Sequence, residues 1–425
     1  MTRNFLAIIG HRRLLQISFA IFVLVYAVLI VLRFLDKPFV VDNNDHYKEL
    51  FTDFLHQGFY QSSVSGTSAL YNFVLAATYQ FTQSVDGAFL IVNAVCDLFY
   101  LVFGWYFLKS LAPVNTAYAH MVFGVYALYI INQQSYLHAS NDTFLGVFVL
   151  GLLYVGLVRF KSPSLKDFAA MGLLLGLAFG TRITAVYLIP LVAILIWHWW
   201  RQNSLEPKYK IAKVGFMALI FVITTLLFHY PSLIEKQKLG YESKEPKSGA
   251  TWIQRNYLGL KKVEQGKEAL HRDAIWQHTK FDVVDAYLNA NGADSLPRTF
   301  IQAVVKDPLL AMEIGLYNCL AVLGRFLRFW GLLLLLPLIV FFRKGSNRLT
   351  KLPIILFFVF AVMLSFTCYT FIEFRWFSGY EILVPASILL SIGHDYMTVT
   401  PLKNALFTLS LMLVTVFNLK SILGS

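Results

Sequence analysis

The stretch 14–35, LLQISFAIFVLVYAVLIVLRFL, is the first of many segments in this sequence that are long and apolar enough to cross a membrane. A membrane-spanning helix needs about 20 predominantly apolar residues. Arg3, Arg12 and Arg13 precede the stretch and no small-residue cleavage site follows it, so we interpret it as a retained helix rather than a signal peptide. Because basic residues collect in cytoplasmic segments, the N-terminus is predicted to be cytoplasmic.

The rest of the sequence has the same character. Hydrophobic residues make up 57% of the 425 residues and charged residues 14%, and the mean hydropathy is +0.60. Soluble domains carry about 25% charged residues. The composition therefore excludes a soluble enzyme, a disordered chain and a fibrous one, and it predicts an all-α polytopic membrane protein with a single membrane domain over 1–425. With 14–35, the further apolar segments predict about eleven transmembrane helices: 87–108, 115–132, 141–159, 167–181, 183–200, 211–230, 327–342, 353–371, 380–395 and 403–420.

The segment 66–82 decides the topology. It is apolar but interrupted by Asn72, Thr78 and Gln80, which is typical of a helix that lies along the membrane interface. If it does not span, the basic residues of the short loops all fall on the cytoplasmic side, whereas a spanning segment would invert this asymmetry. We therefore predict an interfacial helix. The basic residues are Lys109, Arg159, Lys161, Lys166, Arg201, Lys208, Lys210, Lys213, Arg343, Lys344, Arg348 and Lys351.

This topology predicts two sizeable extracytoplasmic segments, 36–86 with interfacial helices and 231–312 as a large loop. It also accounts for the net charge of +12 without nucleic acid as a partner. Cys96, Cys319 and Cys368 lie in apolar segments without CxxC spacing, so neither a disulfide framework nor a zinc site is predicted.

Acidic residues gather on the predicted outer side. Asp42 and Asp45, in Val41-Asp42-Asn43-Asn44-Asp45-His46-Tyr47, would share one face of a helical turn, where a carboxylate can act as a general base toward an acceptor hydroxyl. The alternative is a solvated loop of turn-forming residues. Asp142 follows the next outer loop, which contains His138. It either stabilises the start of a helix or adds a second acidic group to the same side.

Arginines lie on the same predicted side. Arg182 follows the glycines of Gly172-Leu173-Leu174-Leu175-Gly176-Leu177-Ala178-Phe179-Gly180, which would let helices approach closely. Such an arginine is paired or functional, unless it reaches the interface by snorkelling. Arg325 and Arg328 stand at the predicted outer start of 327–342, and Arg375 follows 353–371. Guanidinium groups can hold a phosphate bidentately, and a lipid phosphate is the natural candidate in a membrane.

These patterns resemble the GT-C superfamily of lipid-phosphate-dependent glycosyltransferases, in particular the branch of protein O-mannosyltransferases and lipid A aminoarabinose transferases. The resemblance rests on the order of four short motifs over about residues 1–400. They are 42–60 with Gly58-Phe59-Tyr60, the interfacial and second helices at 66–103, the glycine-rich helix pair at 172–190, and Arg375-Trp376 through Pro385. The chain departs from the family in having Asp42-Asn43 and Asp45-His46 where the first-loop motif often reads Asp-Glu, and Trp376 where Tyr is usual.

The resemblance implies an inverting transfer of a sugar from a polyprenyl or dolichyl phosphate to a lipid, glycan or protein acceptor on the extracytoplasmic face. It implies Asp45 or Asp42 as the general base, and it assigns the donor phosphate to Arg182 and Arg375, with Arg325 and Arg328 as further candidates. It also implies that the substrate is contacted by His46, Tyr47, His138 and Asp142. No cofactor is assigned, and a divalent cation is left open.

Two other functions fit the same architecture. One is a transporter or flippase of lipid-linked sugars, although no internal repeat is found and the polar residues gather at one face, with Asp97 as the exception. The other is a glycan polymerase or ligase that uses lipid-diphosphate donors. The compact length and the lack of credible glycosylation sequons favour a bacterial or archaeal plasma membrane.

Overall fold

A computed structural model describes residues 20–21, 23–28, 31–32, 35, 40–42, 47–65, 68–111, 116–237, 239, 249–271, 275, 277–343, 348–369, 371–395, 409–416 and 418. The described part is built from α-helices and short 3-10 helices, with one isolated β-bridge. Five of its helices are long and apolar enough to cross a membrane by length and composition: Val85–Leu111, Ile183–Gln202, Pro207–Lys236, Pro308–Phe342 and Thr350–Thr367. The prediction of an all-α polytopic membrane protein is therefore confirmed. Half of each of the predicted segments 14–35 and 403–420 lies outside the described residues.

The chain divides into two compact units. The first comprises Met1–Tyr241, Phe326–Phe358 and Arg375–Ser425, and the second Glu242–Arg325 and Val359–Phe374.

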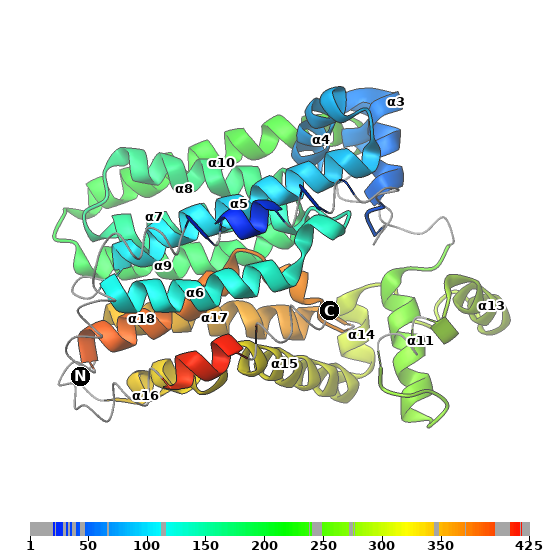
Figure 1. Ribbon diagram of the computed structural model, residues 1–425. Coiled ribbons are helices and arrows are strands. Elements are labelled where there is room, and N and C mark those ends of the chain that lie inside the picture. The colour runs from blue at the N-terminus through cyan, green and yellow to red at the C-terminus, as the bar shows by residue number, and fades with distance from the viewer. Residues whose placement is uncertain are drawn as a thin grey trace. The chain divides into compact units, whose positions relative to one another are not determined.

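The first unit is a bundle of long helices that run side by side (Figure 1). Successive helices reverse direction, so several connecting segments lie at the same end of the bundle: 134–141, 180–183 and 374–382. At this end Asp142 bonds to Arg182 and Arg375. The helices are α5 (Val85–Leu111), α6 (Thr116–Gln133), α7 (Asp142–Val158), α8 (Leu165–Phe179), α9 (Leu188–Gln202), α10 (Pro207–Lys236), α16 (Leu335–Phe342) and α18 (Leu383–Asp395).

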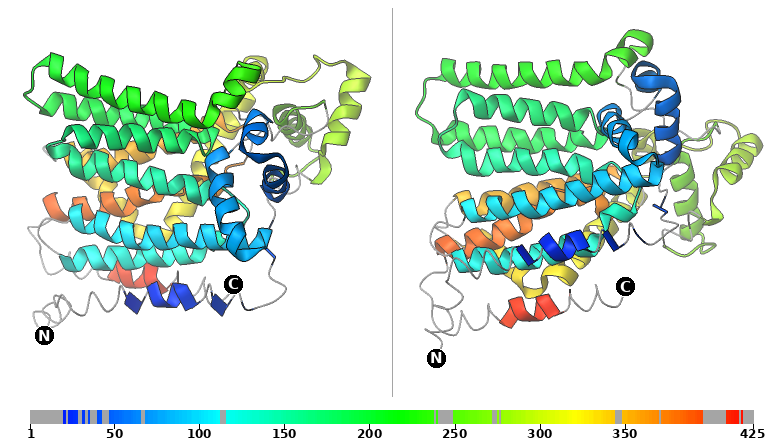
Figure 2. Two further views of the ribbon diagram at one scale, coloured as in Figure 1. Left: turned by 90° about the horizontal axis from the view of Figure 1, so that it is seen from above. Right: turned by 45° about the horizontal axis from the view of Figure 1, so that its top comes forward.

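Two further helices, α3 (Tyr47–Ser65) and α4 (Ala69–Thr82), lie at this same end of the bundle (Figure 2). With 14 residues, α4 is shorter than the roughly 20 that a span requires. Its start is tied to the bundle by the amide of Leu70, which donates to the carbonyl of Gly180 over 3.3 Å. That 66–82 lies along the membrane interface stays a prediction.

Glycines bring α8 and α10 into close contact. A methyl group at Gly176 would lie 2.5 Å from Cβ of Thr224, and one at Gly180 would lie 2.5 Å from the Phe228 ring. The close approach predicted for this glycine series is therefore observed, and its partner is α10.

Asp97 of α5 is fully buried and accepts a hydrogen bond from the hydroxyl of Tyr26, which lies in the N-terminal apolar segment. A buried carboxylate needs such a partner. This bond connects the N-terminal apolar segment to α5.

The apolar helix predicted at 327–342 begins much earlier. Helix α15 runs over Pro308–Trp330 and is followed by 3-10 residues Gly331–Leu334 and by α16. Polar residues such as Asn318 hide this start in the sequence. In the structure Asn318 is satisfied, because its amide nitrogen lies 3.2 Å from the carbonyl of Ser365 and its oxygen accepts from the amide of Ile372 at 3.3 Å. The predicted loop 231–312 therefore extends only to Asp307, and Arg325 and Arg328 lie inside a helix rather than at its start.

The second unit contains small helices from the segment between α10 and α15. Buried residues that include Leu260, Ile275, Val284 and Leu296 form its core. Two of its helices begin with capping boxes, at Thr251 with Gln254 and at Thr299 with Gln302, which satisfy first-turn amides. The helices are α11 (Trp252–Glu264), α13 (Phe281–Asn291) and α14 (Phe300–Lys306). The chain passes between the units within α15 and within α17 (Arg348–Thr367).

Candidate active site

Asp142, the first residue of α7, is the centre of a buried cluster in the first unit. Its carboxylate accepts a 2.5 Å bond from Nη1 of Arg182 at Oδ1 and a 2.5 Å bond from the hydroxyl of Ser140 at Oδ2. Nε of Arg375 lies 3.4 Å from Oδ2. The Asp142 side chain is only 2% exposed. Three candidate residues from separate segments, Asp142, Arg182 and Arg375, are thus brought together.

Neutral side chains hold Arg182 in place. Its Nη1 also lies 2.9 Å from Oδ1 of Asn141 and 3.1 Å from the hydroxyl oxygen of Tyr47. The Tyr47 hydroxyl donates to the same Asn141 oxygen at 2.6 Å, while the Asn141 amide group donates to the hydroxyl of Ser68 and to the carbonyl of Thr181. Asn141 precedes α7 without capping it through its side chain. It connects the Arg182 site to α4 instead.

A close backbone contact brings Arg375 to Asp142. Gly146, one turn along α7, lies against the turn that follows the short 3-10 helix η7 (Phe374–Phe377). A methyl group at Gly146 would lie 2.6 Å from the carbonyl of Ser378, and Gly379 faces the carbonyl of Gly146 with a φ of 81°. Such a φ favours glycine. Two facing glycines therefore let this turn pack directly on α7 and position the arginine.

Asp42 lies at the same end of the bundle and faces solvent. Its amide donates to the carbonyl of Leu137 at 2.8 Å, and its own carbonyl accepts from the amide of Ala139 at 2.9 Å. This parallel bridge holds the Asp42 carboxylate 3.6 Å from Nδ1 of His138. The Asp42 side chain is 71% exposed, so it is accessible to a substrate while Asp142 is not.

His138 is subject to opposite charges, the Asp42 carboxylate and the Arg375 guanidinium. Burial lowers the pKa of His138, the nearby Asp42 carboxylate opposes this shift, and the Arg375 guanidinium lowers the pKa further. His138 is therefore neutral near pH 7. A neutral imidazole can donate or accept one hydrogen bond, and it adds no positive charge beside Arg375.

The other candidate residues are distributed as follows. Tyr47 is buried in the Asp142 cluster. Asp45 and His46 lie outside the described residues. Arg325 belongs to the second unit, where its guanidinium carbon is 4.9 Å from the centroid of the Phe374 ring, and Arg328 is exposed on α15. The phosphate-binding role of these two arginines stays a prediction.

Several supporting residues were not predicted from the sequence. Ser140 and Ser68 bond to Asp142 and Asn141, respectively. Asp86 accepts from the amide of Val41 at 3.1 Å and pairs with Lys48 at 2.5 Å, which ties the Asp42 segment to the start of α5. The polar run Ser140-Asn141-Asp142 ahead of an apolar helix was a usable signal, whereas nothing in the sequence indicated Ser68 or Asp86.

In the part of the chain that the structure describes, no group of three or more His, Cys, Asp or Glu side chains is placed to hold a metal ion. Because Asp45 and His46 lie outside that part, a requirement for a divalent cation stays a prediction.

Comparison with known proteins supports the resemblance drawn from the motifs. Residues 67–228 match the family model of dolichyl-phosphate-mannose-protein mannosyltransferases, a family of the GT-C superfamily. The matched range contains α4 to α10 up to Phe228, and with them His138, Asp142 and Arg182. Neither the curated proteins nor the solved structures gave a match. The GT-C resemblance is confirmed, and the match supports a multi-pass membrane glycosyltransferase.

Proposed function

We propose that this GT-C type membrane protein transfers a sugar from a polyprenyl or dolichyl phosphate to a lipid, glycan or protein acceptor, on the extracytoplasmic face and with inversion at the sugar. The observation that carries the proposal is that an exposed carboxylate, Asp42, lies at the same end of the bundle as two arginines fixed around the buried Asp142. The resemblance and the family match supply the substrate class.

In the proposed reaction, an acceptor hydroxyl attacks the anomeric carbon of the sugar from the face opposite the phosphate. The acceptor proton passes to the carboxylate of Asp42 or Asp45, and a new glycosidic bond forms. The bond from the anomeric carbon to the phosphate oxygen breaks, and its electron pair leaves with the lipid phosphate.

Arg375 and Arg182 stabilise the charge that develops on this leaving phosphate. Fixed cations lower a barrier most when they need no rearrangement in the transition state. The carboxylate of Asp142, the Asn141 amide oxygen and the Tyr47 hydroxyl provide that fixation. Asp142 is a positioning residue in this scheme, because its burial and its three partners leave it unsuited to accept a substrate proton.

The proposal is tested with the purified full-length protein in liposomes, using a panel of labelled polyprenyl-phosphate sugars and a membrane extract as the source of acceptors. Asp42→Asn combined with Asp45→Asn is expected to abolish transfer. Arg375→Gln is expected to lower the rate by about 10²-fold, the usual effect of removing one group that stabilises a transition-state charge. Asp53→Asn, an exposed position on α3, is the matched control and should transfer at the parent rate.

Three outcomes overturn the proposal. Transfer at the normal rate by the double variant removes the proposed base. Transfer from a lipid-diphosphate donor alone assigns the protein to polymerases or ligases. Movement of the labelled lipid across the bilayer without a new glycosidic bond assigns it to transporters.

A further inference from the structure

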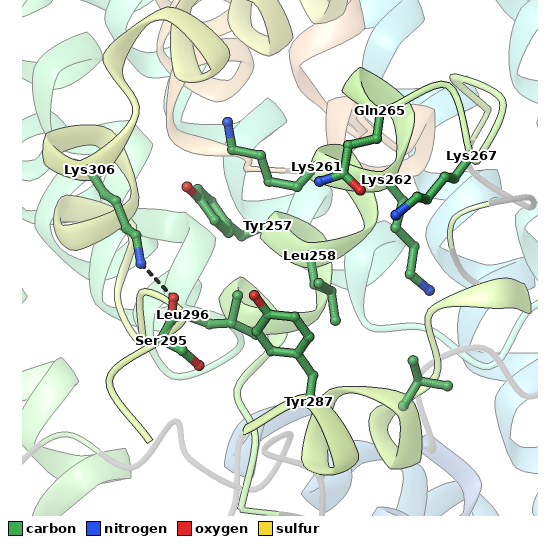
Figure 3. Close-up of a pocket in the computed structure, with 11 residues that line it drawn as sticks. Tyr257, Leu258, Lys261, Lys262, Gln265, Lys267, Tyr287, Ser295, Leu296 and Lys306 are labelled. Carbon is green, nitrogen blue, oxygen red and sulfur yellow. Dashed lines mark hydrogen bonds between the residues drawn. The ribbon is translucent and has the colours of Figure 1, made fainter. Parts of the chain in front are cut away.

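The second unit contains a cavity of about 660 Å³ that the proposed reaction does not use (Figure 3). Its volume falls within the range of about 300–1,000 Å³ that is typical of small-molecule sites. It opens between α11, α13, the segment before α14 and the end of α14. The lining residues are Tyr257, Leu258, Lys261, Lys262, Gln265, Lys267, Val283, Tyr287, Ser295, Leu296 and Lys306.

Positive charge dominates this lining. Lys261 is paired with Asp307 and with Glu264. Lys262 donates to the carbonyl of His278 at 3.1 Å, and Lys306 donates to the carbonyl of Ser295 at 2.5 Å. A carbonyl oxygen orients an ammonium group without neutralising it, so these two lysines, together with the exposed Lys267, keep their charge available to a ligand. The lining residues include no carboxylate.

Two tyrosine rings separate these charges. Figure 3 shows Lys306 at one end of the labelled residues, Lys262 and Lys267 toward the other, and Tyr257 and Tyr287 between them. The ammonium groups of Lys261 and Lys306 lie 5.7 and 5.8 Å from the centroid of the Tyr257 ring. Tyr287 is 37% exposed, so its ring can contact a ligand directly. Tyrosine offers a flat apolar ring and a polar hydroxyl, which suits the two chemical faces of a sugar ring.

We propose that this cavity binds an acidic saccharide, one whose sugar rings carry carboxylate or phosphate groups, as the acceptor of the sugar transfer. The spaced lysines match negative charges distributed along a short glycan, and the tyrosine between them matches a sugar ring. Because the acceptor role rests on the proposed function, binding and transfer are tested separately.

Binding is measured with the purified full-length protein in detergent, without any donor. The probes are fluorescently labelled tetragalacturonate, a mannose oligosaccharide bearing a terminal phosphate, and an uncharged galactose tetramer, with inorganic phosphate and vesicles of an anionic phospholipid as competitors. Tetragalacturonate and the phosphorylated probe should bind, with an affinity that falls as ionic strength rises. The uncharged tetramer should bind at least about tenfold more weakly.

Cavity variants locate the site. Lys262→Gln combined with Lys306→Gln should weaken binding of tetragalacturonate by about tenfold or more, and Tyr287→Ala should weaken it without changing its salt dependence. The matched control is Lys280→Gln combined with Arg298→Gln, which removes the same charge from exposed positions of the same unit that do not line the cavity. It should bind like the parent protein.

Equal binding of the uncharged tetramer, or equal loss in the cavity and control variants, overturns the proposal. Displacement of the saccharide by anionic vesicles but not by inorganic phosphate assigns the cavity to a lipid headgroup instead. In the transfer assay, the cavity variants should raise KM for the acceptor and leave kcat unchanged. If the parent protein binds the saccharide but transfers no sugar, the proposed function alone is contradicted. If it transfers sugar but does not bind the saccharide, this inference alone is contradicted.

Discussion

The two units each contain a cluster in which opposite charges meet, and the clusters differ in how they are enclosed. Around Asp142, the carboxylate is 2% exposed and the two arginines that contact it are 11% and 17% exposed. Around Lys261, the lysine is 29% exposed and its partners Asp307 and Glu264 are 18% and 40% exposed. The carboxylate of the first cluster is buried among neutral hydrogen-bonding groups, whereas the second cluster is partly open to water through Lys261 and Glu264.

This difference separates two uses of charge. A buried pair is costly to desolvate, and further hydrogen bonds to its groups are needed to offset that cost. Ser140 supplies one to Asp142, and Asn141 and Tyr47 supply them to Arg182. An exposed pair contributes little to stability, and its charge is screened by salt. We infer that the first cluster holds its arginines in fixed positions. In the second cluster, the strength of the charge interactions depends on the salt concentration.

The largest expected effect comes from Asp142→Asn. The substitution keeps the shape of the side chain but leaves Arg182 and Arg375 buried without their carboxylate, and removing one partner of a buried pair typically costs about 3–5 kcal/mol. We expect the free energy of unfolding to fall by that amount and sugar transfer to be lost. Denaturant titration of the purified protein, followed by tryptophan fluorescence, measures the first effect.

Glu264→Gln, which removes an exposed carboxylate from the other cluster, is the matched control for this experiment and should change the free energy of unfolding by no more than about 1 kcal/mol. If both variants lose the same stability, the distinction between a buried and an exposed cluster does not hold.

Gly146→Ala should have an intermediate effect. The added methyl group would clash with the Tyr100 hydroxyl and would meet the Ser378 carbonyl at 2.6 Å, so both Tyr100 and the turn that carries Arg375 must shift, at a cost of about 1–3 kcal/mol. Transfer should slow more than stability alone explains, because Arg375 then loses its alignment with Asp142.

Gly215→Ala in α10 is the control for Gly146→Ala. Its methyl group would have no neighbour within 4 Å, and alanine replaces glycine in a helix interior with a gain of about 0.5–1 kcal/mol. Equal transfer rates in the two glycine variants would show that the contact between α7 and the turn does not position Arg375.

Much of the fold was predictable because lipid imposes a simple rule on sequence. Long apolar runs such as 211–230 correspond to helices, and the interrupted segment 66–82 contains the 14-residue helix α4. The rule fails to locate a helix where polar residues inside it find hydrogen-bond partners within the protein. Asn318 reads as a loop residue in the sequence, but backbone groups of 365–372 satisfy it, so the start of α15 at Pro308 was missed.

The sequence indicated which residue types lie together, but it did not indicate which of them are buried. Asp42, Asp142, Arg182 and Arg375 were all expected at one end of the bundle. Which carboxylate is exposed depends on tertiary contacts, since the bridge at Leu137 and Ala139 presents Asp42 to solvent while Ser140 and the arginines enclose Asp142. No local pattern encodes contacts between segments as distant as these, and the Asn141–Ser68 bond is a further example.

The smallest expected effect tests the exposed cluster through Asp307→Asn. Asparagine can still accept the 3.2 Å bond from the amide of Leu310 that starts α15, so the substitution removes charge and little else. The bond from Lys261 lowers the pKa of the Asp307 carboxyl, which means that the folded state favours the charged form. The contribution to stability is therefore present above the unfolded value of about pH 3.9 and is lost as the pH falls through the lower folded pKa. We expect the variant to be less stable than the parent by at most about 1 kcal/mol at neutral pH and low salt, with the difference shrinking in 1 M salt and below about pH 4.

The same change leaves Lys261 with one carboxylate fewer, so tetragalacturonate should bind more tightly to the variant. A large loss of stability that is independent of salt would place Asp307 with Asp142, as a charge that the fold depends on.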